Sequence, residues 1–112
     1  MPHFTIQQQE SGSWFYQLIS SKGHLLLTGT KHEYKQSCHG EILSVRLNSL
    51  YTENYEILQT PENHYYFTLR SMGSNKTIGT SEKFPNPENC QKIINIIKKG
   101  GENAEIKATL TK

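Results

Sequence analysis

The sequence contains an internal repeat, and this repeat limits the possible folds more than any other feature of the chain. The segment that begins at Phe4 returns at Tyr55, an offset of 51 positions, and most of the chain keeps this offset. The apolar positions that it aligns are Phe4 with Tyr55, Ile6 with Ile57, Tyr16 with Phe67, Leu18 with Leu69, Leu27 with Ile78, Ile42 with Ile93, and Val45 with Ile96. We therefore predict a tandem duplication, with residues 4–53 as the first repeat and residues 54–112 as the second.

The first repeat carries signals for three strands followed by a helix. Apolar and polar residues alternate over residues 4–8, which is typical of a half-buried strand. Aromatic and other apolar residues, bounded by turn residues, favour two further strands at residues 14–20 and 25–30. The hydroxyl of Ser37 is placed to cap a helix that runs to about Ser49, because it can accept from the free amides of the first turn.

The second repeat shows the same order with clearer boundaries. It predicts strands at residues 55–60, 64–71 and 76–80, with turn residues between them. Asn86 and Pro87 indicate a helix start, since Asn is a good cap and Pro is tolerated at the first helical position. We expect this helix to end at Gly100 and Gly101 in a left-handed glycine cap, and a last strand to follow near residues 105–109.

Both predicted helices carry apolar residues that require burial. These are Cys90, Ile93, Ile94, Ile96 and Ile97 in the second helix, and Ile42, Leu43, Val45, Leu47 and Leu50 in the first. Two helices on one face of a common antiparallel sheet would bury both sets and one face of every strand. Neither repeat is large enough to bury a core alone. The expected fold is therefore α+β, with two layers, pseudo-twofold symmetry and a single domain over residues 1–112.

Several motifs together resemble the YegP-like family, small bacterial proteins built from tandem copies of a domain of unknown function. They are found at residues 14–18, 26–30 and 40–46 of the first repeat, and at residues 65–69, 78–81 and 93–97 of the second. The resemblance implies tandem β(3)-α-β repeats that exchange their C-terminal strands. Residues 55–59 would then be placed by the crossover between the repeats, and residues 105–109 would pair with the first repeat. The resemblance implies no reaction, ligand or cofactor.

Charge and composition restrict the partners only slightly. The formal net charge is +2, a smaller basic excess than a nucleic-acid-binding domain usually carries. The longest apolar run, Leu25 to Leu27, is far shorter than the roughly 20 residues of a membrane-spanning helix. Since the first residues also lack a signal-peptide pattern, we expect a cytoplasmic protein with reduced cysteines and no membrane partner. Fusion of two repeats in one chain predicts a monomer.

Cys38 and His39 are the residues best placed to carry chemistry. A thiol in the first turn of a helix has a lowered pKa, and an adjacent His can act as a base. This pattern gives an alternative function, a thiol-dependent enzyme or redox protein, but no orienting carboxylate or oxyanion motif accompanies it. His24 and His32 lie nearby in the sequence without the paired short spacings of a zinc site. We therefore assign no catalytic residue, metal or cofactor.

The face of the sheet without helices offers the more informative side chains. Side chains alternate across a strand, so the neighbours of Tyr16, Leu18, Phe67 and Leu69 point away from the helices. The residues expected there are Phe15, Gln17, Ile19, Leu26, Tyr66, Thr68, Arg70 and Thr77. Such a face can bind a protein or peptide, or stack single-stranded bases, or it can have no binding role at all.

We therefore predict a non-enzymatic binding or interaction module that uses this face or the loops at residues 31–37 and 82–87. A weak single-stranded nucleic-acid binder is a further alternative. The identity of the partner stays open.

Overall fold

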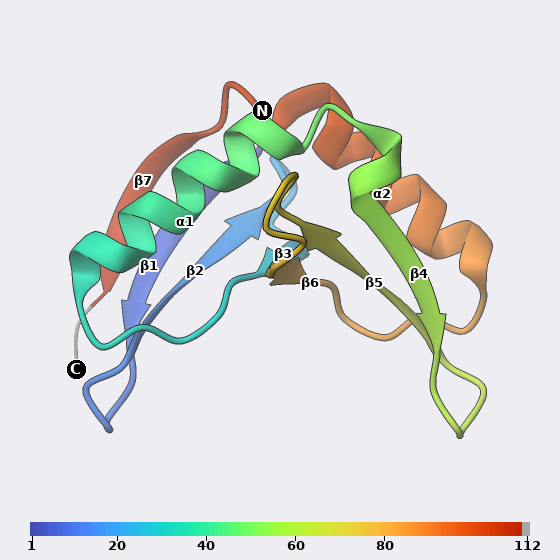
Figure 1. Ribbon diagram of the computed structural model, residues 1–112, viewed down its shortest axis with the longest axis horizontal. Coiled ribbons are helices and arrows are strands. Elements are labelled where there is room, and N and C mark those ends of the chain that lie inside the picture. Colours follow the sequence, from blue (N-terminus) through green and yellow to red (C-terminus); the bar gives the residue numbers. More distant parts are fainter. Residues whose placement is uncertain (111–112) are drawn as a thin grey trace.

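Seven strands form one sheet in the order β4-β5-β6-β3-β2-β1-β7. The computed structural model describes residues 1–110, and its strands are β1 (His3–Gln8), β2 (Trp14–Ile19), β3 (Leu25–Thr28), β4 (Tyr55–Gln59), β5 (Tyr65–Arg70), β6 (Thr77–Thr80) and β7 (Glu105–Leu110). The helices are α1 (Lys35–Asn48), α2 (Pro87–Gly100) and a short 3-10 turn, η1 (Thr52–Asn54). The sheet arches, with the β1–β2 and β4–β5 hairpins as its two arms and β3 and β6 at its centre (Figure 1). The predicted α+β class is confirmed.

The strands of the two halves pair in matching registers. Phe4 lies opposite Leu18 in the β1–β2 hairpin, and Tyr55 lies opposite Leu69 in the β4–β5 hairpin. The halves meet at the centre of the sheet, where Thr28 of β3 pairs with Thr80 of β6. The predicted strands are thus present, each within one or two residues of its expected bounds.

The last strand makes the sheet mixed rather than antiparallel. β7 pairs with β1 as the resemblance implies, but it runs parallel to it, with Phe4 opposite Ile106. Parallel neighbours need a long connection, and the chain between β1 and β7, which contains both helices, supplies it. The expectation of an entirely antiparallel sheet was therefore wrong at this edge.

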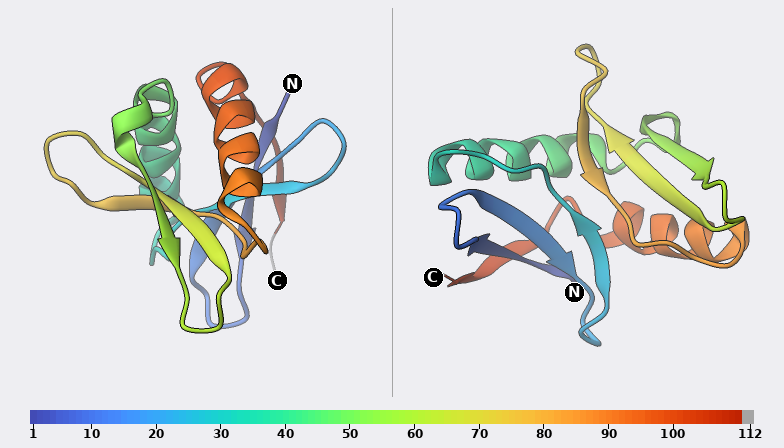
Figure 2. Two further views of the ribbon diagram at one scale, coloured as in Figure 1. Left: turned by 90° about the vertical axis from the view of Figure 1, so that its right-hand side faces the viewer. Right: turned by 90° about the horizontal axis from the view of Figure 1, so that it is seen from below.

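Both helices pack on the same face of the sheet (Figure 2). The buried core between the layers contains Phe4, Ile6, Tyr16, Leu18, Leu26, Leu27, Cys38, Ile42, Val45, Phe67, Leu69, Ile78, Cys90, Ile94, Ile97 and Ala104. The predicted helix stripes are corrected, because Leu43 and Leu47 of α1 are 56% and 73% exposed and only Ile42 and Val45 of that set reach the core. α1 is thus apolar on two sides, and the sheet covers one of them. Ile96 of α2 was also expected to be buried and is 41% exposed.

The helix ends differ in how well the sequence predicted them. α1 begins at Lys35, with Tyr34 at the cap position and no side-chain cap, so Ser37 lies inside the helix. α2 begins as predicted, because the Asn86 side chain accepts a hydrogen bond from the Asn89 amide at 2.9 Å. Gly101 closes α2 with a right-handed φ of −68°, not the expected left-handed one. A Cβ there would lie 2.8 Å from the Ile97 carbonyl oxygen, so the close approach explains the glycine.

Leu26 departs from simple strand alternation. The sequence placed it on the face without helices, whereas it is 1% exposed and lies with Ile93 and Ile96 of α2 beside the same cavity. The register of β2 and β3 shifts between Leu18 and Ile19, and such a bulge changes which face a side chain takes.

Candidate functional site

The face of the sheet opposite the helices, here called the helix-free face, presents the six residues that the sequence singled out. Phe15, Gln17, Ile19, Tyr66 and Arg70 are half-buried, while Thr68 is only 7% exposed. Their neighbours in the same strands are buried under the helices, as the alternation predicts. β3 and β6 lie between β2 and β5, and neighbouring strands are about 4.8 Å apart. The three residues on β2 and the three on β5 therefore form two separate groups on this face.

A continuous row of polar residues crosses the helix-free face. Each member lies opposite the next on the neighbouring strand, and in order they are Thr5, Gln17, Thr28, Thr80, Thr68 and Glu56. Strand alternation predicted only Gln17 and Thr68 of this row, since the other members become neighbours only through the strand order. The spacing of 51 between Thr5 and Glu56, and between Gln17 and Thr68, was the signal that could have found it.

Near both ends of the row, polar contacts join its members to adjacent side chains. The Gln7 amide donates to Gln17 Oε1 at 2.5 Å, and an Arg70 amino group donates to Glu56 Oε1 at 2.8 Å. Thr68 Oγ1 and Arg70 Nε are buried without a hydrogen-bond partner. The half-buried rings of Phe15 and Tyr66 flank the row on their respective strands. The face therefore combines aromatic surface, hydroxyls and amides, and on β5 and β4 its charges offset one another.

The thiol of Cys38 does not have the environment of a nucleophile. It lies fully buried in the core on the sheet side of α1, whereas His39 is exposed. Successive helix residues point about 100° apart, so the two side chains do not face each other. Burial first, and the Glu41 carboxylate second, raise the pKa of this thiol to about 11, whereas a catalytic thiol needs a lowered pKa.

No metal site joins the His and Cys residues of the first repeat. Within the described part of the chain, no three His, Cys, Asp or Glu side chains are grouped so that they could hold a metal ion. His32 instead contacts Glu41, with 3.2 Å between Nε2 and Oε1.

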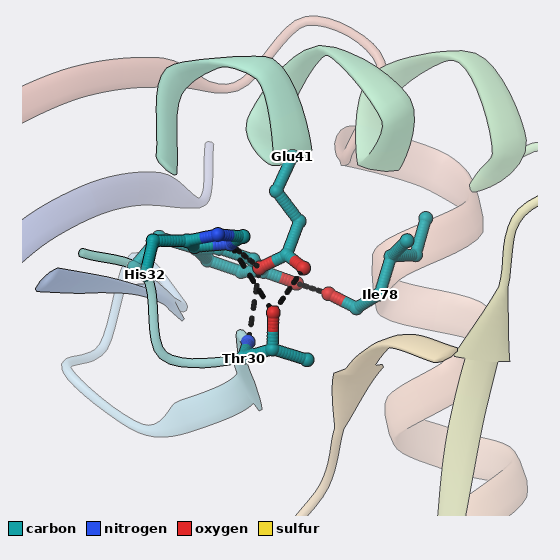
Figure 3. Close-up of polar contacts among 5 residues, drawn as sticks. Thr30, His32, Glu41 and Ile78 are labelled. Atoms are coloured by element: carbon teal, nitrogen blue, oxygen red, sulfur yellow. Dashed lines mark hydrogen bonds and ion pairs between the residues drawn. The ribbon is translucent and has the colours of Figure 1, made fainter. Parts of the chain in front are cut away.

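Glu41 is a buried carboxylate that sequence reasoning missed. It accepts from the Thr30 amide at 2.9 Å and from the Thr30 hydroxyl at 2.5 Å, in addition to its contact with His32 (Figure 3). Close by, the buried Tyr16 hydroxyl donates to the Ile78 carbonyl at 2.8 Å. The two helices are equivalent at an offset of 52, which places the buried Ile42 and Val45 of α1 at Ile94 and Ile97 of α2. The position that corresponds to Glu41 is therefore the apolar Ile93, so α2 has no equivalent of this carboxylate. The Glu41 cluster fixes the loop after β3 against α1.

A polar cavity of about 240 Å³ adjoins this cluster, between α1 and the turn from β5 to β6. Its lining includes four hydroxyls, from Ser37, Ser44, Ser71 and Ser74, together with Gly40, Glu41, His32, Lys76 and Ile78. Small-molecule sites usually enclose about 300–1,000 Å³. The cavity is below that range, and its carboxylate is already bonded within the protein.

Comparison with known proteins identifies several relatives of nearly the same length. No family model matches the chain. The chain is 29% identical over 105 residues to the UPF0339 protein YegP of Yersinia pestis, covering 94% of this chain and 93% of that protein. It is also 29% identical over 104 residues to a UPF0339 protein of Acinetobacter baylyi, covering 93% of each.

Solved structures agree with these sequence matches. The NMR structure of yegP from E. coli, described as a protein of unknown function, matches with a TM-score of 0.90 at 24% identity, covering 97% of this chain and 93% of that one. A UPF0339 protein of Shewanella oneidensis matches with a TM-score of 0.88 at 21% identity, covering 96% and 92%. Among residues 1–110, no helix is long and apolar enough to cross a membrane.

Proposed function

We propose that this chain, which belongs to the YegP-like family, is a binding module that contacts a protein or peptide through its helix-free face. The observation that carries the proposal is the row of six polar residues flanked by the half-buried rings of Phe15 and Tyr66. Aromatic residues supply contact area, and neighbouring hydroxyls and amides supply directional hydrogen bonds, as in protein-binding surfaces.

The charge on this face favours a protein partner over a nucleic acid. Arg70 is already paired with Glu56, and both residues are partly exposed. A single-stranded nucleic-acid site combines stacking rings with a basic groove that follows the phosphates. The rings are present here, but the guanidinium beside them is neutralised by a carboxylate.

Thiol chemistry has less support as the alternative function. The Cys38 thiol is buried and its pKa is raised to about 11, which leaves almost no thiolate at neutral pH. An enzyme or redox protein that acts through this residue would first have to expose it.

We also infer that the two β-β-β-α segments are copies of one ancestral unit, related by a pseudo-twofold axis. The matching registers of the two hairpins support this inference, because the offset of 51 relates Phe4 and Leu18 to Tyr55 and Leu69. The loops repeat a finer detail. Trp14 forms an isolated bridge with His32 at the start of β2, and Tyr65 forms one with Phe84 at the start of β5.

The proposed state is a cytoplasmic monomer of one domain. Two buried, free cysteines are compatible with a reducing compartment. Light scattering at several protein concentrations tests the oligomeric state. A mass near 12.9 kDa at all of them is expected, whereas a mass that stays near twice this value would contradict the proposal.

Site-specific photo-crosslinking in the host cell tests the helix-free face. A photoreactive amino acid is placed at position 15 or at position 66, and for the control at the exposed position 92 on α2. We expect positions 15 and 66 to yield the same discrete protein adduct and position 92 to yield none of it. An adduct that nuclease removes would assign the face to nucleic acid instead. Absence of adducts at both positions, or the same adduct at position 92, would contradict a partner on this face.

A further inference from the structure

The two edges of the sheet differ in whether a further strand lies outside the first strand of each half. β7 lies outside β1 at one edge, whereas β4 forms the other edge with no described strand beyond it. Figure 1 shows these two strands at opposite ends of the arch. An unpaired edge presents a row of free amides and carbonyls, so native proteins normally protect such strands.

β1 and β4 occupy equivalent places in the two halves. In β1, the side chains of Phe4 and Ile6 point to the helix layer and are fully buried, and Ile106 of β7 packs against the same core. In β4, the corresponding Tyr55 is half-buried and Ile57 is 37% exposed. The apolar side of β4 is therefore only partly covered: Tyr55 packs against the core, whereas Ile57 is left exposed at the place where β7 covers β1.

β4 also lacks the usual features that protect an edge. Its sequence from Tyr55 to Gln59 contains no Pro and no Lys, and its pairing with β5 runs without a bulge. Its single charge, Glu56, lies on the helix-free face and is paired with Arg70.

The hydrogen-bond alternation indicates which amides of β4 are free. The Thr60 amide donates to the His64 carbonyl at 2.8 Å, which closes the β4–β5 hairpin. Bonded and non-bonded pairs alternate along an antiparallel ladder. The amides of residues 57 and 59 are therefore expected to point outward without a partner, whereas the Tyr55 amide donates to the Thr52 carbonyl at the end of η1.

We propose that the free edge of β4 accepts an extended segment of a partner protein as an eighth strand, parallel to β4. The segment carries apolar side chains at alternate positions, and these cover Tyr55 and Ile57 as Ile106 covers the β1 edge. Strand addition is an established mode of peptide recognition, in which main-chain bonds give affinity and alternate side chains give specificity. This site is separate from the helix-free face, so either can fail without the other.

A synthetic peptide with the sequence of residues 103–110 is the natural probe, because this segment completes the equivalent edge. The peptide is titrated to millimolar concentration into the ¹⁵N-labelled protein. We expect shifts of the β4 amides, together with cross-peaks that place the peptide isoleucine beside Tyr55 in a parallel arrangement. Shifts centred on β1, an antiparallel arrangement, or no shift would overturn the proposal. So would self-association through β4 in the peptide-free protein.

Two variants at one position provide the matched comparison. Gln59→Pro removes an outward amide while sparing the ladder to β5, whereas Gln59→Thr keeps that amide. Both variants lose the exposed hydrogen bond from the Gln59 side-chain amide to Asn63 Oδ1, so this loss does not affect the comparison. We expect the Pro variant to bind the peptide at least tenfold more weakly than the Thr variant, with both spectra otherwise native. Equal affinity of the two folded variants would contradict strand addition.

Discussion

Replacement of Tyr16 by Phe tests how the two halves of the sheet are held together. The Tyr16 hydroxyl is fully buried and donates to the carbonyl oxygen of Ile78, 62 positions away in β6, at 2.8 Å. The strand pairing between the halves is short, with Thr28 opposite Thr80 as its single register pair. The Tyr16 hydrogen bond is therefore a substantial part of the polar contact at this junction.

The magnitude follows from what the substitution leaves behind. Tyr16→Phe preserves the ring, and the equivalent position in β5 is already Phe67, so the shape is compatible with the fold. The Ile78 carbonyl loses its side-chain donor in a residue that is 4% exposed. A buried group left without its partner costs about 1–3 kcal/mol of unfolding free energy. For a chain of 112 residues, each kcal/mol corresponds to a shift in Tm of about 4 °C.

Urea denaturation followed by the fluorescence of Trp14, the single tryptophan, measures this loss. We expect a lower midpoint and an unchanged slope of free energy against denaturant, because the surface exposed on unfolding is the same. Tyr66→Phe is the control, since Tyr66 lies half-buried on the helix-free face, and its effect should stay within about 0.5 kcal/mol. A Tyr16→Phe variant as stable as this control would refute the reasoning.

Three further predictions concern single positions. Gly29→Ala should strongly lower the unfolding free energy, because a Cβ there would lie 2.2 Å from the Tyr16 ring. Gly40→Ala, as the control, places a Cβ in open space on a helix and should raise the unfolding free energy by up to about 1 kcal/mol. Thermal denaturation measures both changes. Leu47→Ala on the exposed side of α1 should change the unfolding free energy by less than about 0.5 kcal/mol, whereas Ile42→Ala in the core should cost about 2–5 kcal/mol in the same urea assay. The pKa of the Cys38 thiol is raised to about 11 from 9.0, so its contribution to stability is complete below pH 9 and is lost as pH rises toward 11. Alkylation of this thiol in the native protein at pH 8 should accordingly be at least 100-fold slower than in the unfolded chain, and a comparable rate would contradict its burial.

Local patterns predicted most of the elements because their causes are local. The alternation in residues 4–8, the turn residues, and the Asn86 cap each act within a few positions, and the structure has the strands and the helix there. Ser37 misled the prediction of α1 because a residue able to cap a helix can also lie within its first turn. Leu43 and Leu47 misled it because helical spacing identifies apolar positions without showing which side the sheet covers.

The candidate site could be predicted only in part, because several of its contacts join residues that are not neighbours in the sequence. Strand alternation placed Phe15 and Tyr66 on the correct face, since that rule applies within one strand. The polar row depends on which strands are neighbours, and the Glu41 cluster depends on a loop folding back 11 positions onto α1. Glu41 corresponds in α2 to the apolar Ile93, so the repeat gave no sign of a buried carboxylate at this position.

The order of elements explains why one edge of the sheet is open. The chain runs β-β-β-α twice and then adds one strand, so each helix is followed by a strand. The strand after α1 is β4, which is also the first strand of the second half and pairs with β5. It therefore forms this edge itself and leaves no strand to lie outside it. The strand after α2 is β7, which does not begin another hairpin and instead pairs with β1. Nothing in the described chain remains to cover β4, so the exposure of Ile57 follows from connectivity rather than from a poor local sequence. A strand that completes this edge is thus not found among the described residues, in agreement with the proposed strand addition by a partner.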